Sequence, residues 1–548
     1  MDGAFILDDD NNPFSKKITH EIGVSPIEYV DLRTDKEIDD YVARIFAQNS
    51  IKKLIVPVSL GEGGNNELGL RIALHIRLSE RIGEDNLIPI ILISDSSLET
   101  LLINQSNRYA LIAATEGSVL APLDSTEIKA HLNFTTPISK SEFKNKVLDN
   151  VIIKGPETIG PHSMANEWGV IQLDKIANLG SLTASTPALQ RKPSLYFKYL
   201  LSVNRSRTAA SVADNVTSTP NLIPAAGKKI LYIDDEGDKG WVQALTKIFN
   251  RATVVPLTGN NLSEANFMAD IRAQINLEWD LILLDLRLLP WKEDIAGTVH
   301  PIGYYSGTKI LAEIKTINEG AQVMIFTASN KAWNMRDLID LGADGYYIKE
   351  SPKYLIPDNL SLQNYESFKK QVEICFEKKY LRKFFTLKEQ AISQTGNSDL
   401  SFMAYSQNSL NEFFKLLKLG MWETAFISLF LPIEQHTDAL VTGTHGEVMD
   451  LTGTIIQMKV GTNYKMVHDE INYNFQIQTS NKKVRARRGL GKISFTMAFK
   501  FSKDNAYLIR IGQLVEKRNS ISHGSATTIK LQDFEDLIAI LKLFRTHS

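Results

Sequence analysis

Cysteine is almost absent from this sequence: Cys375 stands alone among 548 residues. A single cysteine excludes an intramolecular disulfide bond and any metal site built on several thiolates, and it is typical of proteins from a reducing cytosol. No apolar run approaches the roughly 18–20 residues that cross a bilayer. The start of the sequence also lacks the basic flank and apolar core of a signal peptide. We therefore expect a cytoplasmic protein with no membrane partner.

An excess of charge of either sign is also missing. The 61 lysines and arginines nearly balance the 63 aspartates and glutamates, which gives a formal net charge of -2. This balance predicts no general attraction to nucleic acids or membrane surfaces. The sequence also shows no convincing helix-turn-helix pattern of a transcription factor. A hydrophobic content of 43% is ordinary for a globular protein, and the length predicts three to four domains of about 100–200 residues each.

Four short apolar runs between residues 228 and 352 are each followed directly by polar residues. The runs and their polar successors are 229–233 with Asp234 and Asp235, 279–284 with Asp285, 322–326 with Thr327, and 346–348 with Lys349. Short apolar runs that alternate with amphipathic helices predict strands of a parallel sheet, whose carboxyl ends meet at one edge. We therefore expect three carboxylates, a hydroxyl and an ammonium group to converge on one pocket.

Such a pocket contains the groups that phosphoryl transfer requires. The pair Asp234–Asp235, together with Asp285, would hold a hard divalent cation such as Mg2+, which prefers oxygen ligands. Asp285 would be the nucleophile that accepts the phosphoryl group. Lys349 and the cation would neutralise charge on the transferring group, and Thr327 would hydrogen-bond the new phosphate. Tyr346, three residues before Lys349, would report the change by rotating.

These residues resemble the receiver domain of two-component response regulators, over about a quarter of the chain. Two further segments support the resemblance: Ser306–Lys315, which begins the helix after the phosphoacceptor strand, and Gly342–Gly345 before the last strand. The resemblance implies a five-stranded parallel sheet across residues 228–357. It also implies a phosphorylated Asp285 and a partner that donates the phosphoryl group, either a sensor histidine kinase or a phosphotransfer protein.

Two features depart from the usual receiver pattern. Glu350 follows Lys349 where receivers usually have proline. The segment Arg287–Tyr305 is longer than the corresponding receiver loop. It would either reshape cation binding or form a docking surface, and the sequence leaves both open.

The first 180 residues repeat the receiver pattern without its chemistry. Apolar runs at 4–7, 53–58, 87–93 and 118–121 predict strands, and the first run leads into three aspartates. No aspartate ends the run at 53–58, however, and no lysine follows the run at 118–121. We interpret residues 1–180 as a degenerate receiver-like domain that has lost phosphotransfer and serves contact or sensing.

Two polar segments in this region have alternative interpretations. Gly61–Gly64 could cradle a phosphate, but it lacks the Lys-Ser/Thr of a P-loop, so a flexible loop is favoured. His162, Asn166 and Glu167 stand at near-helical spacing and could bind a ligand or a partner. The start of a capped and packed helix explains this second segment better.

Composition sets the remaining boundaries. Residues 181–227 are rich in Ser, Thr, Ala, Asn and Pro and predict a linker, with a short docked helix around Tyr196–Leu201. An apolar stripe over 362–390 predicts one long helix inside a connecting segment, 358–400. This helix would either pack on its neighbours or act as a rod that carries the receiver's state to the C-terminal part, through a dimer.

Residues 401–548 have the apolar spacing of an all-α domain, with an insertion at about 442–494. Near its end, Arg518 and Asn519 precede His523 within reach of one pocket. Arg518 would bind a phosphate of RNA, His523 would act as a general acid or base, and Asn519 would orient either neighbour. Because the RNA 2′-hydroxyl can itself be the nucleophile, this step requires no metal. The alternative is an exposed helix with an incidental Arg and His.

This motif resembles that of the HEPN superfamily of helical ribonucleases, over about the last 140 residues. The resemblance implies RNA cleavage by a homodimer, in which two sets of Arg518 and His523 form one cleft. It also implies a role in bacterial signalling or antiviral defence. The basic stretch Lys482–Gly489 could grip an RNA backbone, although basic loops more often stay solvated.

The sequence thus predicts a phosphorylation-controlled endoribonuclease, built from two α/β doubly wound receiver-like domains and an all-α HEPN-like domain. Two rival hypotheses remain. In the first, the helical domain is catalytically idle and the protein is a phosphorelay scaffold or adaptor. In the second, the N-terminal domain senses a nucleotide messenger around Gly61–Asn66, and the middle receiver is vestigial.

Overall fold

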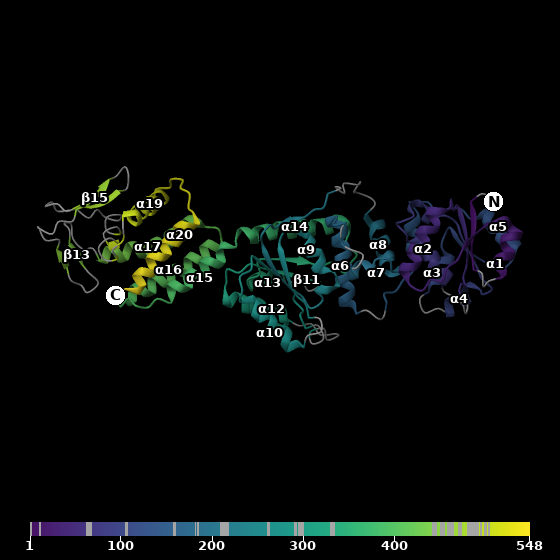
Figure 1. The fold of residues 1–548 in the computed structure, drawn as a ribbon, viewed down its shortest axis with the longest axis horizontal. Helices are drawn as coiled ribbons and strands as arrows, with labels where there is room; N and C mark the ends of the chain where they lie inside the picture. Colours follow the sequence, from purple (N-terminus) through teal and green to yellow (C-terminus); the bar gives the residue numbers. More distant parts are fainter. Residues whose placement is uncertain are drawn as a thin grey trace. The chain divides into compact units, whose positions relative to one another are not determined.

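In the computed structural model the chain forms two compact units. Figure 1 colours the chain from its N-terminus to its C-terminus. One unit contains residues 1–311 and 323–374, and the other contains 312–322 and 375–548. The structure describes residues 3–9, 13–61, 68–104, 108–156, 160–180, 182, 186–208, 219–259, 263–289, 293, 301–328, 335–440, 447–449, 455–457, 465–469, 474–478, 493, 496–497, 501, 503 and 505–547. None of the described helices combines the length and apolar character that a membrane span requires.

The first unit begins with a five-stranded parallel sheet of order β2-β1-β3-β4-β5. This is the 2-1-3-4-5 order of flavodoxin-like folds. The strands are β1 (Ala4–Asp8), β2 (Ser25–Glu28), β3 (Lys53–Pro57), β4 (Ile90–Ile93) and β5 (Ser118–Ala121). Four of the five strands coincide with the apolar runs of the sequence. The exception is the edge strand β2, which contains Pro26 and buries only Ile27.

Helices cover both faces of this sheet. On β3, Leu54 and Val56 belong to one hydrophobic core and Ile55 to the other, because successive side chains of a strand point to opposite faces. Helices α2 and α3 complete the first core, and α1 and α5 complete the second, so the sheet lies between two helical layers (Figure 1). The helices are α1 (Pro13–Ile18), α2 (Asp35–Gln48), α3 (Leu68–Arg77), α4 (Leu98–Asn104) and α5 (Ser125–Phe134).

A second five-stranded parallel sheet has the order β12-β11-β10-β7-β9. Counted along the chain, this is again 2-1-3-4-5. Its strands are β7 (Lys229–Ile233), β9 (Thr253–Leu257), β10 (Leu281–Leu284), β11 (Val323–Thr327) and β12 (Gly345–Ile348). The associated helices are α9 (Trp241–Ile248), α10 (Glu264–Ile275), α12 (Ser306–Ile317), α13 (Met335–Asp340) and α14 (Asp358–Glu377), and β6 (Ile223–Pro224) pairs with β8 (Phe249–Asn250). The predicted doubly wound α/β folds are therefore present in both regions.

Three helices connect the two sheets along the chain: α6 (Pro161–Ala177), α7 (Pro187–Arg191) and α8 (Leu195–Thr208). Helix α6 has Pro161 in its first turn and ends at Asn178, whose φ of 49° is left-handed. Both features are usual at helix ends, and they confirm the expected helix start at this segment. Helix α8 is docked, as expected, because Lys198 is buried and its Nζ lies 2.6 Å from Asp39 of α2.

The expectation of one helix over 362–390 is wrong. Helix α14 ends at Glu377, and α15 (Tyr380–Ile392) begins three residues later. The buried residues Cys375 and Leu381 lie six positions apart, an offset that would put them on different faces of a continuous helix. The break lets each helix bury its own apolar stripe.

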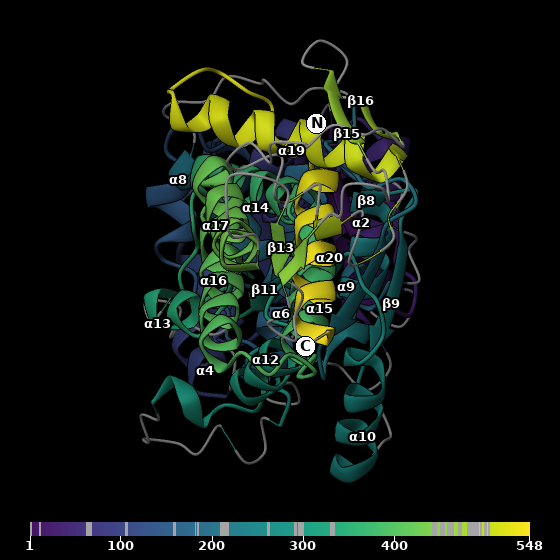
Figure 2. The same ribbon diagram turned by 90° about the vertical axis from the view of Figure 1, so that its left-hand side faces the viewer.

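The second unit is mainly helical. Helix α15 is followed by α16 (Leu400–Lys418), α17 (Trp422–Leu440), α19 (Asn505–Ser522) and α20 (Leu531–Thr546). Figure 2 shows α16 and α17 side by side, with α20 beside α15. Within the insertion, two antiparallel pairs add strands to the predicted all-α region: β13 (Glu447–Met449) with β14 (Ile455–Gln457), and β15 (Lys465–Asp469) with β16 (Asn474–Gln478).

Candidate functional site

The carboxyl ends of four strands in the second sheet bring together the polar residues expected from the sequence. Asp234 follows β7, Asp285 follows β10, Thr327 ends β11 and Lys349 follows β12. Backbone hydrogen bonds hold these ends in register: the Asp285 N–H donates to the Ile233 carbonyl at 2.9 Å, and the Lys349 N–H to the Thr327 carbonyl at 2.8 Å. All four side chains are buried, with exposed fractions of 0–1%.

A buried ion pair lies at the base of this pocket. The ammonium group of Lys349 contacts the Asp234 carboxylate, to which the Tyr232 hydroxyl also donates. Burial by itself lowers the pKa of Lys349, but the charges of Asp234 and Asp285 outweigh burial and raise that pKa above its ordinary value. The lysine is therefore held as a cation directed at two carboxylates.

Asp285 lies beside this pair and is fully buried. The Thr327 hydroxyl interacts with its carboxylate and favours the charged form. Burial raises the pKa of Asp285; Lys349 opposes the rise and the charge of Asp234 adds to it. A buried carboxylate is costly unless a cation or another partner compensates its charge.

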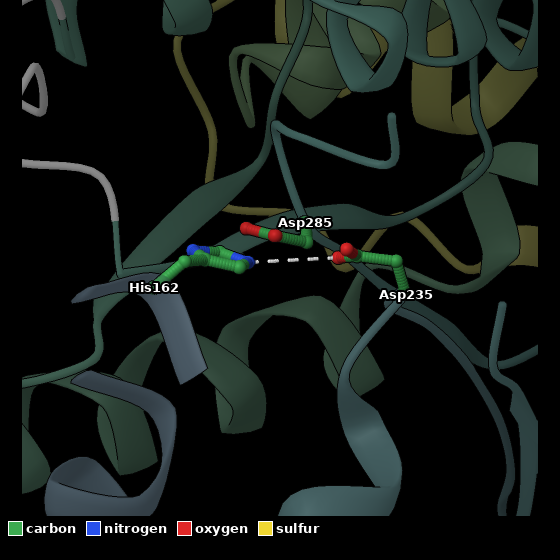
Figure 3. A group of neighbouring side chains, drawn as sticks. All are labelled: His162, Asp235 and Asp285. Atoms are coloured by element: carbon green, nitrogen blue, oxygen red, sulfur yellow. Dashed lines mark ion pairs between the residues drawn. The ribbon is translucent and has the colours of Figure 1, made fainter. Parts of the chain in front are cut away.

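Asp235 and His162 line the other side of the pocket. One ligand atom from each of His162, Asp235 and Asp285 lies within 4.8 Å of the others, and Figure 3 shows the three side chains converging. Burial raises the pKa of Asp235 to about 6. Buried carboxylates fit a hard divalent cation, so the residues present are compatible with the predicted Mg2+.

The imidazole of His162 lies between Arg287 and Asp235. Arg287 Nη2 lies 3.0 Å from His162 Nδ1. Nε2 faces Asp235 Oδ1 at 3.8 Å, along the dashed line of Figure 3. Burial lowers the pKa of His162, but the carboxylates of Asp235 and Asp285 outweigh burial and raise that pKa above its ordinary value.

Helix α6 contributes a second residue, Asn166, to the pocket. The Asn166 amide oxygen accepts hydrogen bonds from Lys349 Nζ at 3.0 Å and from Trp241 Nε1 at 3.1 Å. Sequence reasoning noted His162 and Asn166 but assigned them to a packed helix start. No local signal connects them to the pocket, because Asn166 and Lys349 lie 183 residues apart in the chain.

The two tyrosines of β12 differ in burial. Tyr347 is buried and stacks on Phe326, with ring centroids 4.9 Å apart. The predicted switch residue, Tyr346, is half-buried and its backbone N–H donates to Gln371. Its role as a switch stays a prediction.

The two departures from the receiver pattern have different outcomes. Glu350 is buried, and burial raises its pKa to about 7. Within the long segment 287–305, Glu293 accepts a hydrogen bond from the Ser306 hydroxyl at 3.2 Å, at the start of α12. The residues 290–292 and 294–300 lie outside the described part of the chain, so the proposed cation-shaping or docking role of this segment stays a prediction.

The corresponding edge of the first sheet retains part of the pocket. Extending the strand register sets Pro57 opposite Asp8, two residues beyond the last β1–β3 pair, and Asp285 opposite Asp234, one residue beyond the last β7–β10 pair. Pro57 therefore takes the place of Asp285. The aspartates of the first sheet are used locally: Ser15 donates to Asp8 at 2.6 Å and the Gly61 N–H to Asp9 at 2.7 Å. Continuing the register across the sheet sets Leu123 in the place of Lys349.

The carboxylate of Asp285 and the ammonium group of Lys349 thus have no counterpart in the first domain. Proline offers no carboxylate at the acceptor position, and Leu123 offers no ammonium group and is 41% exposed. Residues 62–67 lie outside the described part, so the nucleotide-binding alternative around Gly61–Asn66 rests on sequence alone.

The predicted ribonuclease residues lie at the end of α19 in the second unit. Arg518 Nη2 contacts both carboxylate oxygens of Glu434, at 2.7 and 3.0 Å, and Nη1 donates to Asn519 Oδ1 at 3.3 Å. His523 lies just beyond the helix and is exposed. The basic stretch 482–489 lies outside the described residues.

One family model matches part of the N-terminal region. Residues 10–121 match the family model of the inactive receiver domain, iREC. The N-terminal region is receiver-like. This match confirms the interpretation of that region as a receiver-type α/β domain.

Solved structures similar to the chain include several receiver proteins. A two-component response regulator of the LuxR family from Aurantimonas sp. SI85-9A1 is 20% identical, with 26% of this chain and 86% of that chain covered and a TM-score of 0.18. A CheY-like receiver domain protein from Methanospirillum hungatei JF-1 is 21% identical, with 26% and 99% covered and a TM-score of 0.16. A Burkholderia pseudomallei response regulator, solved with a phosphorylated aspartic acid and a calcium ion, is 18% identical, with 26% and 74% covered and a TM-score of 0.17. No curated protein matches the sequence.

Proposed function

We propose that this protein is a phosphorylation-responsive signalling protein of the response-regulator type, in which residues 228–357 are the working receiver and residues 1–180 an inactive one. The observation that carries the proposal is the state of Asp285. Its carboxylate ends the central strand of the sheet, is fully buried, and faces Asp235 and the Lys349 ammonium group.

The chemistry that these residues support is transfer of one phosphoryl group. An oxygen of the ionised Asp285 forms a bond to phosphorus, and the bond from phosphorus to the donor's leaving oxygen or nitrogen breaks, with the electron pair leaving on the donor. Lys349 stabilises the negative charge of the transferring group, and the Thr327 hydroxyl donates to one of its oxygens. A Mg2+ ion held by Asp234, Asp235 and Asp285 would supply further charge neutralisation. The donor would be a sensor histidine kinase or a phosphotransfer protein.

Transfer of label from acetyl phosphate tests this assignment. With Mg2+ present, the wild-type protein should acquire about one phosphoryl group per chain that is labile to alkali and hydroxylamine. The Asp285→Asn variant and a wild-type sample treated with a chelator should acquire essentially none, since the amide is a poor nucleophile and the carboxylates lose their cation. Asp340→Asn, an exposed aspartate on α13 of the same domain, is the matched control and should label normally. Equal labelling of Asp285→Asn and wild type would overturn the proposal.

The second unit would carry the output, and RNA cleavage is the candidate activity for it. Its support is the placement of Arg518, Asn519 and the exposed His523 at one helix end. The Glu434 carboxylate that holds Arg518 would have to yield to an RNA phosphate, for example when two chains pair. Incubation of labelled RNA with wild type and with His523→Ala tests the activity. Equal, negligible cleavage by both proteins would instead favour an adaptor whose helical unit only binds partners.

A further inference from the structure

Helix α6 covers the pocket of the second sheet with polar side chains that pair with the pocket's own groups. Asn166 is fully buried and is bonded on both sides of its amide. Its oxygen accepts from Lys349 Nζ at 3.0 Å, and its nitrogen donates to Glu236 Oε2 at 3.0 Å. One turn earlier, the Ser163 hydroxyl also donates to Glu236, the residue that follows the Asp234–Asp235 pair.

The surfaces of α6 and the receiver are also matched in shape. A Cβ atom on Gly169 would lie 2.7 Å from the ring of Trp241 and 3.3 Å from the Glu350 carbonyl oxygen. A Cβ atom on Gly240 would lie 3.1 Å from Val170 of α6. Glycine at positions 169 and 240 therefore lets α6 approach Trp241 and the backbone of Gly240 more closely than a residue with a Cβ atom would. These contacts define a specific docking site for the helix.

The Asn166 oxygen accepts a hydrogen bond from Lys349, which in a phosphorylated receiver would donate to the phosphoryl group instead. Lys349 would donate to a phosphoryl oxygen on Asp285, and a hydrogen bond to a charged oxygen is stronger than one to an amide. The phosphoryl group would also project from Asp285 into the space bounded by His162, whose ligand atom lies within 4.8 Å of the Asp285 carboxylate. His162 thus borders the space that the new group would enter, and Asn166 holds the lysine that would bind it.

We propose that α6 is an intramolecular ligand of the phosphoacceptor pocket, which occupies Lys349 through Asn166 and is displaced when Asp285 is phosphorylated. This inference rests on the proposed function of Asp285. Because coupling between two binding events is reciprocal, a helix that phosphorylation expels must also hinder phosphorylation by the same factor. Helix α6 lies in the chain between the two sheets, so a partner that binds the N-terminal domain could adjust the hindrance.

Hydrogen exchange of the full-length protein tests the displacement. Backbone amides of residues 161–177 should be protected in the resting protein and should exchange at least tenfold faster after addition of beryllofluoride and Mg2+, which mimic the phosphoryl group on the acceptor. Mg2+ alone should leave their protection nearly unchanged. Unaltered protection of α6 after beryllofluoride has bound would overturn the proposal, and this measurement needs no variant.

Two substitutions test the hindrance. Asn166→Ala removes the hydrogen bond to Lys349 and should raise the initial rate of acetyl-phosphate labelling about tenfold, as expected for loss of one hydrogen bond to a charged group. Gly169→Leu should have a similar effect by separating α6 from Trp241. Gln190→Ala, an exposed position on the neighbouring helix α7, is the control and should label at the wild-type rate.

The outcomes separate this inference from the function on which it rests. If neither wild type nor any variant labels, and beryllofluoride does not bind, the assignment of Asp285 itself fails. If wild type labels normally while Asn166→Ala and Gly169→Leu, both shown to be folded by circular dichroism, label no faster, only the role of α6 is wrong. Faster labelling with increased exchange of α6 supports both.

Discussion

The two receiver-like domains of this chain share the order of their strands and differ in the side chains at the carboxyl ends of those strands. In each, a glycine near the start of a helix touches the end of the central strand: a Cβ on Gly69 would lie 1.9 Å from the Pro57 carbonyl oxygen, and one on Gly307 would lie 2.0 Å from the Asp285 carbonyl oxygen. The strand order is the same in both sheets. What differs is the side chain at the strand end, proline in one domain and aspartate in the other. The fold therefore persists without the chemistry that it positions.

Each domain also has a fully buried cationic side chain, and the two cations have different partners. In the second domain Lys349 directs its charge at the carboxylates of the pocket. In the first domain the fully buried cation is Arg77, which donates to the backbone carbonyls of Asn86, Ile88 and Gly117 at 2.7–2.8 Å. One cation faces the carboxylates of the proposed phosphoacceptor site, and the other binds backbone carbonyls of loops. A receiver fold that loses its pocket can thus use buried charge for stability alone.

Exchanging the lysine for the residue of the other domain should have the largest effect. Lys349→Leu copies Leu123 into the second domain and leaves Asp234 buried without its ammonium partner, which we expect to cost about 3–5 kcal/mol of unfolding free energy. Phosphoryl labelling should also disappear. The measurement is hydrogen exchange of peptides from β10 to β12 in increasing urea. The reverse change, Leu123→Lys at a 41% exposed position, should alter stability by less than about 0.5 kcal/mol. Comparable losses for the two variants would contradict the difference between the domains.

Adding a methyl group at the shared glycine should affect both domains alike. Gly69→Ala and Gly307→Ala each force a Cβ atom against a backbone oxygen, and we expect each to destabilise its own domain by about 3 kcal/mol. Gly303→Ala, which meets nothing within 4 Å, is the control. Thermal unfolding followed by domain-specific hydrogen exchange reports the two losses separately. A tolerated substitution in only one domain would show that the frameworks differ.

The pH dependence of stability should have opposite signs at two equivalent carboxyl groups. Register sets Asp124 in the place of Glu350. Burial raises the pKa of Glu350 to about 7; Ser361 and Lys175 oppose the rise and Asp358 adds to it. The folded state therefore binds the proton more tightly than the unfolded state. The resulting stability is fully present below pH of about 4.5 and is lost as the pH rises through about 7, with a magnitude on the order of 2 kcal/mol.

At Asp124 the sign is reversed. Hydrogen bonds from the backbone N–H groups of Glu127 and Thr126 lower the pKa of this exposed carboxyl, so its contribution is present above the ordinary pKa of an aspartate and is lost as the pH falls through the lowered value. Urea unfolding between pH 2 and pH 8 measures both slopes. Glu350→Gln should remove the loss of stability above pH 5 and Asp124→Asn should leave it in place; an unchanged slope in Glu350→Gln would refute this account.

The sequence was informative wherever a signal was local. Apolar runs that end in Asp234, Asp285, Thr327 or Lys349 predicted both the strands and their meeting edge, because the carboxyl ends of parallel strands must adjoin. The two strands that no run announced, β2 and β9, each contain a proline and have few buried side chains. Edge strands need only one buried face and one paired side, so their pattern is weak.

Signals that depend on distant partners were not readable. Asn166 has the composition of a helix start, and only folding brings it against Lys349, 183 residues later. The break between α14 and α15 is set by which core each helix buries, and periodicity alone showed only an imperfect stripe. Glu350 looked like a departure from a pattern, whereas its burial and pKa follow from the packing of α14 and α6 around it.

The missing side chain at Gly169 offers a practical consequence. A Cβ atom at this position would lie 2.7 Å from the ring of Trp241. The size of the side chain at position 169 therefore sets how closely α6 can approach the second sheet domain. Alanine, serine, valine and leucine placed there form a graded series of spacers. Such a series would yield proteins whose resting balance between the covered and the open pocket shifts stepwise, so that signalling output could be calibrated without touching a reactive group.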